Sequence, residues 1–163
     1  MKSNRLLAGL AAALAILASP GTAHAATIVR PFAADSGDAC RYGSTSGTLG
    51  WRNGATTSPL PFIAVDVRGQ VTDRPTPDDP STACRDDGYF SVAIFTAYAG
   101  SVAVDRETRT ANNASASFLF TLGGTSTTTS IDRVVVQVCR HPLVTLPPSY
   151  CGKAVTYLAP PTA

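Results

Sequence analysis

The sequence predicts an all-β protein, a single β-sandwich held by two disulfide bonds. Apolar residues after residue 25 recur with a period of two rather than 3.6, and no window of eleven residues carries a convincing amphipathic helical stripe. The predicted strands are short and are separated by turns rich in Gly, Asn, Asp, Ser and Pro. About seven or eight such strands favour two packed sheets, and an immunoglobulin-like arrangement is the version we expect.

Residues 1–25 are predicted to be a secretory signal peptide. Lys2 and Arg5 form a positive start, residues 6–18 form an uncharged run rich in Ala and Leu, and Ala23-His24-Ala25 has the pattern of a cleavage site. The apolar run is too short to span a bilayer comfortably. We therefore expect a secreted protein that is cleaved after Ala25, with one domain over residues 26–163 and no membrane insertion after signal removal.

Cleavage would also change the charge balance. It removes two bases and no acid, so that thirteen Lys and Arg fall to eleven, against eleven Asp and Glu. The formal net charge then drops from +2 to about zero, and the remaining bases are spread singly along the chain. Because no run of bases follows a phosphate backbone, the sequence predicts no nucleic-acid partner.

The first half of the predicted domain contains weak strand patterns near residues 27–32 and 48–52 and a strong one at 62–68. In the strong pattern, Ile63 and Val65 lie on one face. Gly69 then interrupts the pattern, as a residue at a β-bulge does.

The second half predicts a hairpin, residues 89–98 and 102–106, followed by strands at 116–122, 131–140 and 153–158. In each strand one set of alternating apolar residues is assigned to the interior. The predicted core is Ile63, Val65, Phe90, Val92, Ile94, Phe118, Phe120, Val134, Val136 and Val138.

Four cysteines in an exported chain predict two disulfides, and three pairings are possible. We favour Cys40 with Cys84 and Cys139 with Cys151, because each pair joins segments that could be neighbouring strands or loops. The spacing does not suit a zinc site, and His141 is the only histidine after the signal. The cysteine and histidine pattern therefore predicts no metal centre, and the sequence predicts no cofactor.

The order of several motifs resembles that of small exported proteins of actinobacteria. These motifs are Gly69-Gln70-Val71-Thr72-Asp73, Cys84, the strand ending in Val138-Cys139, and the closing Tyr150-Cys151-Gly152, over roughly the last hundred residues. Those proteins are of unknown function. The resemblance implies export, disulfides and a β fold, and it implies no catalytic or binding residue.

The residues with catalytic potential lack the patterns that catalysis needs. The sequence contains no Gly-x-Ser-x-Gly motif, which would supply a nucleophilic serine for His141 to activate as a general base. The adjacent carboxylates of Asp78-Asp79 and of Asp86-Asp87 point to opposite sides of an extended chain and so cannot act as a catalytic pair. Trp51 is interpreted as a core residue rather than a sugar-binding platform. Calcium binding by the Asp-rich loops stays open. We predict that the protein is not an enzyme.

The segment between Cys139 and Cys151 is the candidate binding site. Its eleven residues are stiffened by three prolines and carry apolar side chains, and they form either a preorganised binding loop or an ordinary strand connection that folds back onto the core. The candidate residues are His141, Leu143, Val144, Leu146 and Tyr150. We predict a non-enzymatic extracellular domain that binds a protein, a glycan or a cell-envelope component. The alternative is an inhibitor of a secreted hydrolase that acts through this loop.

Overall fold

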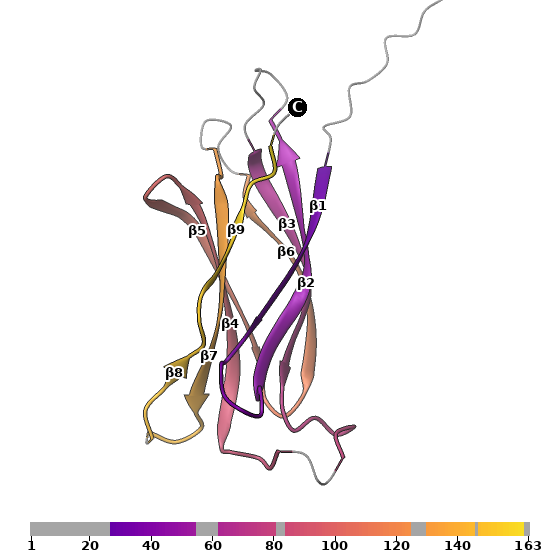
Figure 1. Ribbon diagram of the computed structural model, residues 1–163, viewed down its shortest axis with the longest axis vertical. Coiled ribbons are helices and arrows are strands. Elements are labelled where there is room, and N and C mark those ends of the chain that lie inside the picture. The colour runs from indigo at the N-terminus through magenta and orange to yellow at the C-terminus, as the bar shows by residue number, and fades with distance from the viewer. Residues whose placement is uncertain (1–26, 55–61, 81–83, 125–129, 146, 162–163) are drawn as a thin grey trace, which may run out of the picture.

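The computed structural model describes residues 27–54, 62–80, 84–124, 130–145 and 147–161. Within these ranges the chain forms nine β-strands and no helix. The strands make two antiparallel sheets that pack as a sandwich (Figure 1). The predicted all-β sandwich is therefore confirmed, whereas the predicted signal peptide lies outside the described residues.

The first sheet has the order β1 (Thr27–Asp35), β2 (Gly43–Asn53), β3 (Phe62–Asp73) and β6 (Ser115–Gly123). The second has the order β5 (Val102–Ala111), β4 (Tyr89–Ala99), β7 (Arg133–Pro142) and β8 (Tyr150–Cys151), and β9 (Val155–Leu158) also pairs with β7. Strands β1, β2 and β3 share one sheet, whereas the immunoglobulin order places the third strand in the opposite sheet. The immunoglobulin-like arrangement is therefore not confirmed.

Aromatic side chains fill the space between the sheets. Phe95 of β4 is fully buried. Its ring meets three others edge-on, at centroid distances of 5.2 to 5.5 Å, those of Phe32, Phe118 and Phe120. Trp51 is also fully buried and packs edge-on against Phe62. The interpretation of Trp51 as a core residue is thus confirmed.

The face of β4 was assigned wrongly from the sequence. Its inward residues are Ser91, Ala93, Phe95 and Ala97, so that Phe90, Val92 and Ile94 lie half-buried on the outer face. Both faces of this strand are apolar, and a period of two cannot choose between them. The interior selects the face with small residues because the facing sheet already supplies large aromatic rings.

The remaining predicted core residues lie inward, with one exception. Val65, Phe118, Val134, Val136 and Val138 are buried, and Phe120 packs against them. Ile63 is only half-buried, since Phe62 and Ala64 pair with Asn53 and Arg52 and leave Ile63 as the extra residue of a register shift.

Gly69 does not form the bulge predicted for it, because β3 continues through it opposite Gly47. The two glycines allow their backbones to approach closely. A Cβ on Gly47 would lie 2.0 Å from the carbonyl oxygen of Arg68.

Both disulfides form with the favoured pairing. Cys40 and Cys84 have Cα atoms 5.9 Å apart and join the β1–β2 turn to the segment before β4. Cys139 and Cys151 lie directly opposite each other on β7 and β8, with Cα atoms 3.9 Å apart. Two disulfides indicate an oxidising compartment. The described residues include no helix with the length and hydropathy needed to cross a membrane.

Candidate functional site

Described residues of three segments meet at one end of the sandwich, the lower end in Figure 1: 35–43, 73–80 with 84–88, and 140–145 with 147–151. We call this the hairpin end, because the β7–β8 hairpin projects from it. The segments are joined by the Cys40–Cys84 disulfide and by a hydrogen bond of 2.9 Å from Leu143 N to Gly88 O. This end therefore brings together charged, hydroxyl and aromatic side chains from three segments that are far apart in the sequence.

The base of the hairpin is held from several sides. The Cys139–Cys151 disulfide closes it, and Ser149 Oγ lies 3.0 Å from His141 Nδ1 across the two arms. The His141 ring stacks on Phe90 of β4, with centroids 5.6 Å apart. Phe90, on the outer face of β4, therefore supports the base of the hairpin through its contact with His141.

Tyr89 provides a second support from β4. Its hydroxyl donates to the carbonyl oxygen of Pro148 at 3.4 Å, and its ring packs edge-on against Tyr150. The arms of the hairpin are therefore tied to the sheet as well as to each other.

The tip of the hairpin presents apolar side chains to solvent. Leu143 and Val144 are 54% and 69% exposed, and Thr145 and Pro147 are exposed as well. Leu143 and Val144 thus do not fold back onto the core. Leu146 lies outside the described residues. Of the other candidates, His141 and Tyr150 lie at the base rather than the tip.

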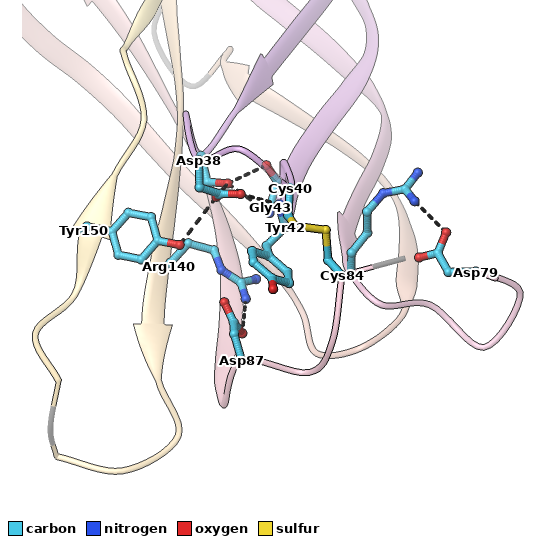
Figure 2. The surroundings of a disulfide bond; sticks show 11 residues. Asp38, Cys40, Tyr42, Gly43, Asp79, Cys84, Asp87, Arg140 and Tyr150 are labelled. Carbon is cyan, nitrogen blue, oxygen red and sulfur yellow. Dashed lines mark hydrogen bonds and ion pairs between the residues drawn. A yellow bond between two sulfur atoms is a disulfide. The ribbon is translucent and has the colours of Figure 1, made fainter. Parts of the chain in front are cut away.

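A buried arginine lies beneath the hairpin. Arg140 of β7 is fully buried and pairs with two carboxylates, those of Asp73 and Asp87, the latter at 2.6 Å. It also donates to Ser91 Oγ at 2.7 Å. The ring of Tyr42 lies 5.3 Å from its guanidinium (Figure 2). The ring of Tyr89 lies 5.9 Å from the same group.

Asp73 completes this charged cluster. It is fully buried and accepts hydrogen bonds from Ser91 Oγ at 2.6 Å and from Asn113 N at 2.8 Å. Gly43 leaves the room that the cluster needs, since a Cβ there would lie 2.6 Å from Ser91 Oγ and 3.1 Å from Arg140 Cδ. The alternation of β7 places Arg140 on the inner face with Val136 and Val138. Sequence reasoning missed the cluster because an arginine at the end of a strand is usually exposed.

Asp38 fixes the β1–β2 turn against the hairpin. It accepts from Ser36 Oγ, from Tyr42 N at 3.0 Å and from Tyr150 Oη at 3.4 Å (Figure 2). Partial burial opposes ionisation of this carboxyl, but the hydrogen bonds and the charge of Arg140 outweigh it, so that the pKa of Asp38 is lowered. Burial, followed by the Asp38 carboxylate, raises the pKa of Tyr150, which therefore stays a neutral donor.

The lowered pKa of Asp38 predicts a stability contribution that depends on pH. A carboxyl whose pKa is lower in the folded state stabilises the protein above its unfolded pKa and loses that effect as pH falls through the folded pKa. We expect Asp38→Asn to destabilise the protein at neutral pH and to differ less from the wild type below about pH 4. Denaturant unfolding of both proteins between pH 3 and 7 measures this difference. A gap that stays constant over this range would contradict the prediction.

Two aspartates of the Asp-rich loops, Asp79 and Asp86, are engaged with donors of the chain. Asp79 pairs with Arg74 at 2.5 Å and accepts from Thr76 N at 2.7 Å, and Asp86 accepts from Gly88 N at 2.9 Å. Among the described residues, no group of three or more His, Cys, Asp or Glu side chains has the geometry to hold a metal ion.

Comparisons of the chain with family models, with curated proteins and with solved structures found no match.

Proposed function

We propose that the protein is an exported, non-enzymatic binding domain that captures an extracellular partner protein through the tip of the Cys139–Cys151 hairpin. One observation supports this most directly. Leu143 and Val144 are more than half exposed, yet they extend from a hairpin whose base is covalently closed and braced by His141 and Ser149. A loop already held in one shape loses less entropy on association, and exposed aliphatic side chains provide area to bury.

The charge of the hairpin end supports a partner with a basic contact surface. Residues 35–43, 73–88 and 140–151 contain seven aspartates and four arginines, a formal net charge of −3. The rest of residues 26–163 contains seven bases and four acids, a net charge of +3. Such a separation of charge accelerates encounter with a surface of opposite sign and orients the molecule with its hairpin end forward.

Inhibition of a secreted hydrolase is a second candidate function. The exposed, proline-flanked tip supports it, because a rigid extended loop is the shape that fits a protease cleft. The same surface would serve both functions, so the two are distinguished by the activity of secreted proteases in the presence of the protein. An inhibitor lowers that activity, whereas a domain that binds another partner leaves it unchanged.

Val144→Asp is expected to weaken partner capture by about tenfold or more, because it places a charge in a contact that an apolar side chain would otherwise fill. The measurement is capture from culture supernatant and purified cell wall, with residues 26–163 as bait, followed by titration with the captured protein. Val102→Asp is the matched control. Val102 is 61% exposed and begins β5, at the other end of the sandwich (Figure 1).

Capture that Val144→Asp and Leu143→Ala leave unchanged would refute the hairpin as the binding site. The Ser149–His141 contact also permits a direct test of the non-enzymatic proposal. Turnover of an ester or peptide substrate that both Ser149→Ala and His141→Ala abolish would overturn it, since a brace alone has no role in bond cleavage.

A further inference from the structure

The outer face of the sheet β1-β2-β3-β6 contains an open groove of about 670 Å³. It lies on the sheet that does not carry the hairpin. Two cross-strand rows cross it, one formed by Val29, Gly50, Asp66 and Thr121 and the next by Thr48, Arg68 and Leu119. Val29 on β1 and Leu119 on β6 lie at opposite sides of the groove and are 58% and 64% exposed. The polar side chains of the groove include Asp66 and Arg68 on β3, between them.

Gly50 keeps the floor of the groove open. A Cβ at this position would lie 3.3 Å from the Thr27 methyl group and 3.6 Å from Asp66, close to ordinary contact distances. Gly47 on the same strand is different, because a Cβ there would collide with the backbone of β3 at 2.0 Å. Packing of the sheet therefore requires glycine at position 47 but not at position 50. The main effect of Gly50 is that the groove above it is not filled by a side chain.

The polar groups in the groove are a carboxylate, a guanidinium and hydroxyls. Asp66 is held in place by Thr121 Oγ1 at 2.7 Å and by Arg52 Nε at 3.0 Å. Arg68 is exposed and forms no ion pair with any residue that the structure describes. The exposed hydroxyls of Thr27 and Thr48 can both donate and accept.

We propose that this groove binds an acidic glycan, a sugar chain that bears carboxylates. Sugar hydroxyls can form hydrogen bonds with the threonine hydroxyls and donate to the fixed Asp66 carboxylate. The apolar C–H faces of the sugar rings can pack against Val29 and Leu119. The guanidinium of Arg68, which has no ion-pair partner in the described part of the chain, selects glycans with a carboxylate and binds it through two parallel N–H donors. The site is independent of the hairpin and adds a second ligand to the proposed binding domain.

Calorimetric titration of residues 26–163 with an oligogalacturonate tests this proposal, with a cello-oligosaccharide as the neutral glycan and a poly-glutamate peptide as the acidic non-glycan. We expect binding of the oligogalacturonate only, weakened about tenfold by Arg68→Gln through loss of the charge-assisted hydrogen bonds. Gly50→Val should weaken it at least as much by filling the floor. Arg106→Gln removes the same charge from an exposed position on β5 and should change nothing.

Thermal unfolding of each variant shows whether it keeps its fold, and Arg68→Gln tests the site even if Gly50→Val unfolds. Equal affinity for the neutral glycan, preference for poly-glutamate, no binding of oligogalacturonate, or binding that Arg68→Gln leaves unchanged would each overturn the proposal. Val144→Asp should leave oligogalacturonate binding intact, which separates this site from the hairpin.

Discussion

Replacement of Arg140 by methionine is expected to lower the free energy of unfolding by about 3–5 kcal/mol, because it leaves the carboxylate of Asp73 buried without its cation. Arg140 and Asp73 are both fully buried, and the pair joins β7 to the end of β3 across the two sheets. Asp87 also loses its partner, but its side chain is 19% exposed and can be hydrated in the variant. Denaturant unfolding at neutral pH measures the loss.

The double variant Asp73→Asn with Arg140→Met is the control for this prediction. It removes both buried charges, so it should be less destabilised than Arg140→Met alone, even though it carries one more substitution. If Arg140→Met costs less than about 1 kcal/mol, the ion pair contributes no more than an exposed one does, and the buried cluster is not a main support of the hairpin end.

Phe95→Ala is expected to destabilise the protein by about 3–5 kcal/mol, because it removes a fully buried ring and leaves a cavity among three other aromatic rings. Phe90→Ala is the matched control on the same strand. Phe90 lies half-buried on the outer face and contacts the His141 ring, so its loss should cost less than half as much.

Thermal and denaturant unfolding of the two variants test the face of β4 directly. A larger cost for Phe90→Ala than for Phe95→Ala would reverse the assignment, since a shift of one residue exchanges the two faces of a strand. The pair also separates stability from binding, because Phe90→Ala should loosen the hairpin base while the core stays intact.

The outward face of β4 shows the limit of periodicity as a guide. In β3, β6 and β7 one face is polar enough for alternation to identify the inner residues, such as Val65, Phe118 and Val136. In β4 both faces carry aromatic and aliphatic side chains. The choice between them depends on the volumes of residues in the facing sheet, and these come from parts of the chain far from residues 89–99.

The candidate site shows the same division. The cysteine spacing and the prolines between Cys139 and Cys151 were enough to predict a closed, stiffened loop, because covalent closure and proline rigidity are local properties. They left open whether its apolar residues fold back onto the core, and only the structure shows Leu143 and Val144 exposed. The braces of that loop come from Tyr89 and Phe90, which lie about 50 to 60 residues earlier in the chain than the residues they contact. No local pattern marks them as neighbours of His141 and Pro148.

The sequence by itself determined the all-β class and most strand positions, because alternation and turn residues act over short stretches of chain. It favoured, among three possible pairings, the two disulfides that form. Only the tertiary structure decided the inner face of β4, the burial of Arg140 beside Asp73, and the open floor above Gly50. Each of these depends on which side chains non-consecutive strands bring opposite one another, and that is set by the packing of the whole sandwich.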